Sequence, residues 1–272
     1  MASPYVAYVD TRRLSNVLEH PWPSLPSSYQ KTPLVLATVG VVLIATGVLR
    51  IGSAPLASVA MIAGGLALVA PALAARSTPA SSATGATYHG TAGSVGSASE
   101  KFGDSAAIGA RGERQTAELL DLLKDKVPGL HIFHGVRFPG SKNADIDHVL
   151  VYGDRVMLVD SKLFGAGQYG MSRHHDTTAS YTDWWIFKDG RPWKPSAMPN
   201  AASAMRAALG SGVKVRSVLV IHGKDARVAP GQKDCYRPEQ FMSEAVYDFL
   251  RSASTPTPKP SVLRHLESQL IR

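Results

Sequence analysis

Two short stretches of the sequence carry acidic side chains and one lysine at positions that a pair of β-strands would bring together. Asp145 and Asp147 alternate with other residues in the first stretch, and Asp160 and Lys162 do so in the second. Side chains along a strand alternate between its faces, so each pair shares one face. Residues 152–155 include Gly and Asp and predict a tight hairpin turn. Carboxylates at the ends of buried strands are costly unless they pair or bind a cation, so the pattern suggests a metal site.

A third acidic residue, Glu113, is placed by a predicted helix. An apolar stripe runs through residues 106–126, and the helical spacing puts Glu113 on that stripe. Glu113 should therefore lean toward the sheet. Gly109 and Gly112 remove side-chain bulk beside it, which would let a backbone or a phosphate approach. Close helix packing is the alternative explanation of the two glycines.

These residues belong to a block, 101–251, with the pattern of a compact α/β domain. Alternating apolar residues predict strands, and stripes of helical spacing predict helices on either side of them. The strands are expected at 131–138, 144–152, 155–162 and 215–222, a further hairpin at 184–193, and helices at 106–126, 201–209 and 238–250. We therefore expect a mixed central sheet flanked by helices.

Together these residues resemble the NERD (nuclease-related) domain family over about residues 104–250. The matching elements are Gly109-x-x-Gly112-Glu113, the strand at 145–151, Asp160-x-Lys162, the Trp184 region and Asn200 before a helix. The family looks like a branch of the PD-(D/E)xK nucleases. The resemblance implies a restriction-endonuclease-like fold and a metal-dependent phosphodiesterase that acts on nucleic acid, with DNA as the expected substrate.

The resemblance also implies a role for each residue of the site. Asp147 and Asp160 would be the direct ligands of Mg²⁺ or Mn²⁺, because hard cations prefer oxygen ligands. Glu113 would hold the water shell of that ion or a second ion. Lys162 would position the attacking water or stabilise negative charge in the transition state. His148, on the opposite strand face from Asp147, is expected to be a hydrogen-bonded core histidine.

The charge of the chain favours an anionic partner, since its net value is +8 at pH 7. Four basic residues are candidates for phosphate contacts, with ordinary surface charge as the equal alternative: Arg111, Arg114, Lys142 and Arg173. Trp184, Trp185 and Trp193 could stack bases, although aromatic hairpins more often cover a sheet. Cys235 is the only cysteine, which excludes an intrachain disulfide and fits a reducing compartment.

Residues 33–75 predict a membrane anchor, because Arg50 is the only charged residue among them. About 20 apolar residues cross a bilayer as a helix. The segments 33–49 and 55–75 therefore predict two transmembrane helices joined by a short turn, with a buried helical hairpin in a soluble core as the alternative. Basic residues precede and follow the hairpin, which places both ends of the chain in the cytoplasm.

The remaining segments connect or extend these parts. Residues 1–32 are expected to be a cytoplasmic tail, and 76–100, rich in Ser, Thr, Ala and Gly, a flexible linker. Residues 252–272 predict a Pro-rich linker and a short amphipathic helix. That helix could dock on the domain, on a partner or on the membrane surface.

Two positions depart from the pattern of the resembled family. Asp160 stands where the family more often has Glu, and the helix after Asn200 lacks the usual proline and glutamine. The alternative function is therefore a non-catalytic module that binds nucleic acid or protein beside the membrane. A third hypothesis makes the hairpin at 33–75 the functional part and the domain an assembly surface.

Overall fold

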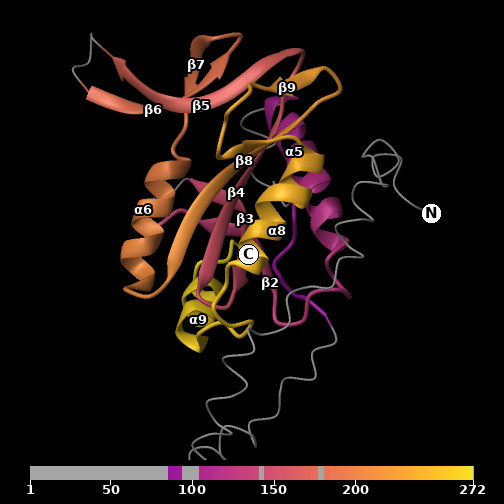
Figure 1. Ribbon diagram of the computed structural model, residues 1–272, viewed down its shortest axis with the longest axis vertical. Coiled ribbons are helices and arrows are strands. Elements are labelled where there is room, and N and C mark those ends of the chain that lie inside the picture. Colours follow the sequence, from indigo (N-terminus) through magenta and orange to yellow (C-terminus); the bar gives the residue numbers. More distant parts are fainter. Residues whose placement is uncertain (1–84, 94–103, 141–143, 177–180, 272) are drawn as a thin grey trace, which may run out of the picture. The chain divides into compact units, whose positions relative to one another are not determined.

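The computed structural model describes residues 85–93, 104–140, 144–176 and 181–271, which form two β-sheets and their covering helices (Figure 1). The strands are β1 Thr87–His89, β2 His131–Arg137, β3 Asp145–Tyr152, β4 Arg155–Leu163, β5 Gly167–Asp176, β6 Tyr181–Lys188, β7 Arg191–Pro195, β8 Lys214–His222, β9 Ala226–Val228 and β10 Cys235–Tyr236. The helices are α5 Asp104–Asp121, α6 Met198–Leu209, α7 Pro238–Gln240, α8 Tyr247–Arg251 and α9 Pro260–Ser268, and the π-helical turn Phe241–Val246 joins α7 to α8.

The larger sheet is mixed, as the sequence predicts. In the described part of the chain its order is β1-β2-β3-β4-β8-β10. The strands β2, β3 and β4 form an antiparallel meander, whereas β1 pairs in parallel with β2, and β8 pairs in parallel with β4 and β10. The expected α/β class with helices flanking sheets is therefore confirmed.

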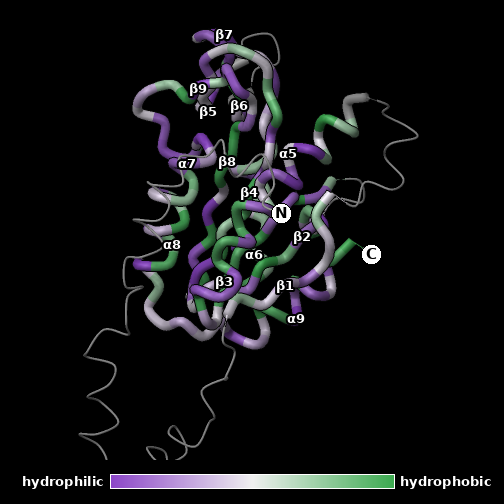
Figure 2. Tube along the Cα trace, turned by 90° about the vertical axis from the view of Figure 1, so that its right-hand side faces the viewer, coloured by the Kyte–Doolittle hydropathy of each residue, from purple (hydrophilic) through white to green (hydrophobic). Residues whose placement is uncertain are grey.

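Both faces of this sheet are buried, and the alternation of side chains decides which helices each residue meets. On one face, Val159 of β4 packs in a core with Leu120 of α5 and Phe249 of α8. On the other face, Leu158 packs in a second core with Met205 of α6 and with α9. Hydrophobic colour accordingly follows much of the central strands (Figure 2).

A second sheet has the order β7-β6-β5-β9 in the described residues. Its strands β5, β6 and β7 lie between β4 and α6 in the chain, whereas β9 follows β8. The hairpin of β6 and β7 is the one expected at 184–193, and Asp189 and Gly190 in its turn have φ of 51° and 77°. A type I′ hairpin turn requires positive φ at both central positions, which Asp-Gly supplies. The strands β5 and β9 are not predicted, because β9 has only three residues and most of β5 is polar or glycine. Ile186 and Tyr169 pack this sheet against Leu219 of β8.

The helix α6 begins at Met198, three residues before the predicted start at 201. Pro199 lies in its first turn, where a missing N–H does no harm. A proline therefore opens this helix one residue before Asn200. Asn200 itself is exposed, and its amide donates to Oδ1 of Asp183 over 3.4 Å.

The prediction of a flexible linker at 76–100 is wrong for residues 85–93, the part of this segment that the structure describes. Thr87–His89 pairs with β2 as the edge strand β1, and the Tyr88 hydroxyl donates to the Leu120 carbonyl over 2.9 Å. The edge of β2 offers unpaired backbone groups, and a short Thr-Tyr-His segment with high β-propensity satisfies them. A brief strand of this kind is invisible within a Ser- and Gly-rich composition.

The C-terminal helix docks on the domain, which decides between the three partners considered for it. Val262 and Leu266 of α9 are buried in the core shared with α6. Beyond α9, the Gln269 carbonyl accepts from Arg137 N–H over 2.9 Å, and Ile271 N–H donates to the Gly135 carbonyl over 2.9 Å. The domain expected at 101–251 therefore includes β1 and α9.

The predicted cytoplasmic tail at 1–32 and the transmembrane hairpin at 33–75 lie outside the described residues. Among the residues that are described, no helix is both long and apolar enough to cross a membrane.

Candidate active site at the β3–β4 hairpin

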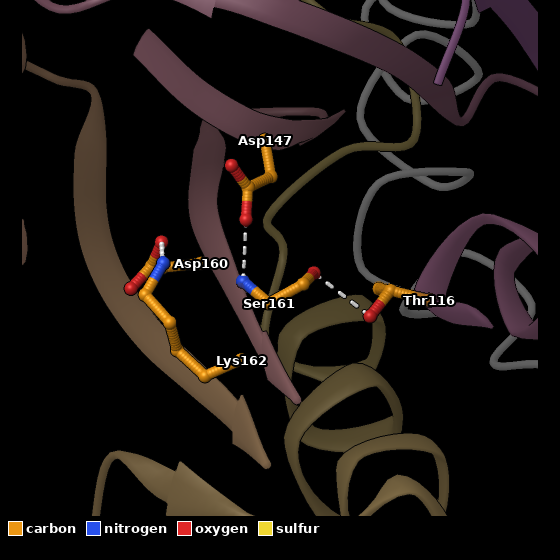
Figure 3. A network of polar contacts seen from close by, with 5 residues as sticks. All are labelled: Thr116, Asp147, Asp160, Ser161 and Lys162. Carbon is orange, nitrogen blue, oxygen red and sulfur yellow. Dashed lines mark hydrogen bonds and ion pairs between the residues drawn. The ribbon is translucent and has the colours of Figure 1, made fainter. Parts of the chain in front are cut away.

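The β3–β4 hairpin brings the predicted acidic residues together. His148 pairs with Val159, so the same register, continued by one residue, sets Asp147 opposite Asp160. The Ser161 N–H donates to Oδ2 of Asp147 over 2.6 Å, and Nζ of Lys162 lies 2.5 Å from Oδ1 of Asp160 (Figure 3). Residues directly opposite in antiparallel strands lie on the same face. The spacing in the sequence therefore predicted a real side-chain cluster.

The helix α5 adds Glu113 to this cluster, as its apolar stripe predicts. Glu113 lines a cleft of about 340 Å³ together with Ser161 and Lys162. The two neighbouring glycines have different roles. A Cβ atom on Gly112 would lie 3.2 Å from the Leu163 nitrogen, so Gly112 allows α5 to pack closely on β4, whereas a Cβ on Gly109 would meet nothing within 4 Å. Gly109 lines the cleft instead.

A buried polar chain fixes α5 against the sheet beneath the site. The Ser161 hydroxyl donates to Oγ1 of Thr116 over 2.8 Å, and Oγ1 of Thr116 lies 2.7 Å from Nε2 of His222. Burial, followed by the charge of Arg237, lowers the pKa of His222 to about 3, so the ring is neutral. The Thr116 hydroxyl can therefore donate to Nε2 of His222. The hydroxyl protons of Ser161 and Thr116 then both have an acceptor.

Sequence reasoning missed the contributions of Thr116 and His222. Thr116 follows Glu113 by one helical turn and so faces the same direction, which is a signal that could have found it. His222 ends β8 and offers no such signal. The prediction for His148 is confirmed, since it is fully buried and its Nδ1 lies 2.7 Å from Nδ1 of His134.

Burial and neighbouring charge raise the pKa of two carboxyl groups at the site. Burial and the charge of Asp160 raise the pKa of Asp147 well above its usual value, and Lys162 opposes this only in part. Burial and the charge of Asp145 raise the pKa of Glu113, against the effects of Lys162 and the Gly93 N–H. Ionising Asp147 and Glu113 together in this buried position therefore costs free energy.

The pKa of Lys162 is also raised, which for a lysine favours the charged form. Burial by itself lowers the pKa of Lys162, but the carboxylates of Asp160, Asp147 and Glu113 outweigh burial and raise it above its usual value. Lys162 is consequently an ammonium at neutral pH and a hydrogen-bond donor only.

Asp145 lies closer to the site than its sequence position suggests. It is exposed at the start of β3, yet its charge is the second-largest cause of the raised pKa of Glu113, after burial. Lys142, three residues before Asp145, is outside the described residues.

The donor atoms of the site are of the type that a hard cation prefers. Asp147 and Asp160 present carboxylate oxygens only, and each uses one oxygen in the bonds to Ser161 and Lys162. Across the described residues, no group of three or more His, Cys, Asp or Glu side chains is arranged to hold a metal ion. Mg²⁺ is commonly bound by one or two carboxylates, with water and substrate phosphate completing its octahedron. Two carboxylates lie within the usual number of protein ligands for this ion.

The basic residues around the cleft differ from those expected. Lys162 lines the cleft together with Lys188 and Lys194. Lys188 and Lys194 come from the β6–β7 hairpin. Of the predicted phosphate contacts, Lys142 lies outside the described residues, and the exposed Arg111, Arg114 and Arg173 are not among the residues lining this cleft. Arg173 instead lies over the Trp184 ring, 5.7 Å from its centroid.

The fold and the site together define a mixed α/β protein with a carboxylate and lysine cluster at the end of adjacent central strands. Residues 108–222 match the model of the NERD family, described as a nuclease-related domain. Glu113, Asp147, Asp160 and Lys162 all lie within the matched span. Comparisons with curated proteins and with solved structures give no match. The resemblance found in the sequence is thus confirmed over 108–222, and it points to a nuclease-related function.

The raised pKa of Asp147 predicts that Asp147→Asn stabilises the fold. The folded protein disfavours the Asp147 carboxylate, so its destabilising effect is complete above the folded pKa and disappears as the pH falls through that value. Asparagine removes the charge and keeps an oxygen for the Ser161 N–H. We expect the free energy of unfolding at pH 7 to rise by about 0.5–2 kcal/mol, the usual gain from a single stabilising substitution.

Chemical unfolding at neutral and at acidic pH checks this result. The gain from Asp147→Asn should shrink as the pH falls, whereas Asp248→Asn, at an exposed position of α8, should change stability at neither pH. A loss of stability at pH 7 would contradict the expected electrostatic strain.

Proposed function

We propose that this protein is a metal-dependent nuclease that hydrolyses phosphodiester bonds of DNA. The observation that carries the proposal is the convergence of Asp147, Asp160, Glu113 and Lys162 within the segment that matches the nuclease-related domain. We further propose that residues 33–75 anchor the protein in a membrane and that the domain faces the cytoplasm. The apolar composition of 33–75 and its basic flanks support the anchor.

In this proposal the acidic residues and the lysine have different roles. Asp147 and Asp160 would hold Mg²⁺ or Mn²⁺, relieving the repulsion that raises the pKa of Asp147. The ion would lower the pKa of a bound water and neutralise charge on the phosphate. Glu113 would accept hydrogen bonds from water in the cleft. Lys162, held as an ammonium, would donate to a phosphate oxygen and stabilise the charge that develops there.

A second candidate function is binding of nucleic acid without cleavage. The ion pair between Lys162 and Asp160 favours it, because an internal ammonium already neutralises one of the two carboxylates. The aspartate at 160, where the resembled family more often has Glu, and the missing glutamine after Asn200 point the same way.

The deciding experiment incubates the full-length protein with labelled DNA in EDTA, Mg²⁺ or Mn²⁺. We expect cleavage only with the divalent ions. Asp160→Ala should abolish it, because the ion loses a direct ligand, whereas Asp248→Ala, an exposed change in α8, should retain it.

The other outcomes separate the alternatives. Salt-sensitive DNA binding without cleavage under either ion would favour the binding module. Undiminished cleavage by Asp160→Ala would refute the assignment of the site, and a chain that neither binds nor cleaves DNA would refute both functions.

A further inference from the structure

The cleft beside the proposed active site has an unusual apolar rim. Within the described residues, the exposed large apolar side chains are Ile108 and Trp193, which are 51% and 43% exposed. They come from α5 and β7, far apart in the sequence, and both line the cleft that contains Glu113 and Lys162. Exposure of large apolar groups is costly, and a paired occurrence at one cleft points to a ligand that covers them.

Trp193 is held in place by other rings. Its ring centroid lies 4.8 Å from that of Phe164 with the planes at 77°, and 5.6 Å from that of Tyr169. Edge-to-face and tilted pairs of this kind are favourable aromatic arrangements. The Trp193 ring is therefore a fixed surface, and binding against it would not require a flexible side chain to be ordered.

Two ammonium groups lie over this ring. Nζ of Lys194 is 4.3 Å from the Trp193 centroid, and Nζ of Lys188 is 5.9 Å from it. Burial and the charge of Lys162 lower the pKa of Lys194, whereas Asp160 acts against them, so Lys194 lies close to the proposed catalytic groups. The cleft thus combines an aromatic ring with the ammonium groups of Lys162, Lys188 and Lys194.

This combination matches the chemistry of a nucleotide with an unpaired base. Stacking on aromatic side chains and contact of phosphates with lysine are how proteins hold single strands. A base inside a duplex has both faces covered by its neighbours and cannot stack on Trp193 unless it leaves the helix. A cleft of about 340 Å³ is the size of a small-molecule site. It accommodates one nucleotide rather than a duplex.

We propose that this cleft binds one unpaired nucleotide of a single-stranded nucleic acid, with the base against Trp193 and the phosphate between Lys194 and Lys162. The proposal rests on the proposed nuclease function and names its substrate class. The β6–β7 hairpin, which carries Trp193 and Lys194, then acts as the strand-binding part of the protein (Figure 1).

Binding of the full-length protein in EDTA tests the proposal without cleavage. Fluorescence anisotropy would compare a short oligothymidylate, the same strand in a duplex with oligoadenylate, and an oligouridylate. We expect the single strand to bind more tightly than the duplex. Trp193→Leu should weaken oligothymidylate binding by about 5- to 150-fold, the loss associated with one stacked base.

Matched variants separate stacking from folding. Trp193→Phe should retain most of the affinity, because a ring remains. Tyr247→Leu removes an aromatic side chain of α8 that does not line this cleft, and should leave binding unchanged. Lys194→Met should lower the slope of log K against log salt by about 0.7, the value for one lost phosphate contact on a single strand.

The outcomes distinguish this proposal from the nuclease proposal. Equal binding of single strand and duplex, or an unchanged affinity of Trp193→Leu, would overturn the nucleotide site even if the protein cleaves DNA. Preferential and Trp193-dependent binding would support it even if no metal produces cleavage. Tighter binding of oligouridylate than oligothymidylate would support the site and assign it to RNA.

Discussion

Lys162→Met is expected to lower the rate of DNA cleavage by about 10²- to 10³-fold while leaving Mg²⁺ binding intact or tighter. The carboxylates around Lys162 raise its pKa, so the side chain is an ammonium and cannot serve as the general base. Its proposed contribution is the stabilisation of charge on the phosphate, which methionine cannot replace although it preserves most of the side-chain volume.

Lys162→Met is not expected to weaken Mg²⁺ binding, although it lowers the rate of cleavage. Nζ of Lys162 lies 2.5 Å from Oδ1 of Asp160, so the ammonium competes with a cation for this carboxylate. Removing the ammonium also removes positive charge from beside Asp147 and Glu113. Both changes should favour cation binding at the site.

Calorimetric titration with Mg²⁺ and single-turnover cleavage together check this prediction. Lys224→Met removes an ammonium from an exposed position and should change neither quantity. If Lys162→Met cleaved DNA at the rate of the unmodified protein, Lys162 would have no part in the chemistry. Weaker Mg²⁺ binding would show that the lysine does not compete for Asp160.

Leu266→Ala is expected to lower the free energy of unfolding by about 2–5 kcal/mol, the usual cost of truncating a fully buried leucine. Leu266 is fully buried in the core that α9 shares with α6 and the central sheet. The loss should be visible as a lower midpoint in chemical denaturation. Arg264→Ala, on the exposed side of the same helix, should stay within about 0.5 kcal/mol of the unmodified protein.

This comparison also separates the sites considered for the C-terminal helix. If α9 served a membrane surface instead of the core, Leu266→Ala would leave unfolding unchanged and would weaken binding to lipid vesicles. An unchanged denaturation midpoint would therefore contradict the packing of α9 on the domain.

The arrangement of the β3–β4 site follows from local rules that act within a few residues. Strand alternation puts Asp160 and Lys162 on one face, and the Gly-Asp turn fixes the register that sets Asp147 opposite Asp160. The apolar stripe of α5 likewise fixes the direction of Glu113. Because each of these relations depends on backbone geometry over short distances, the sequence by itself was enough to predict them.

The surroundings of the site depend on contacts between segments that are distant in the sequence. Lys194 and Trp193 reach the cleft because a second sheet packs against β8, and the polar sequence of β5 contains no alternation that predicts that sheet. Thr116 and His222 meet only because α5 packs on β4 and β8. Neither periodicity nor composition encodes which side chains oppose each other across such a boundary.

The two ends of the domain also depend on contacts between distant segments. The strand β1 and the helix α9 are short, and isolated elements of this length are marginal in water. Their stability comes from the edge of β2 and from the core beside α6, respectively. The sequence by itself therefore determined the acidic cluster and the strands and helix that carry it. Only the tertiary structure decided which cationic and aromatic side chains surround the cluster, because burial of apolar surface between distant segments brings them there.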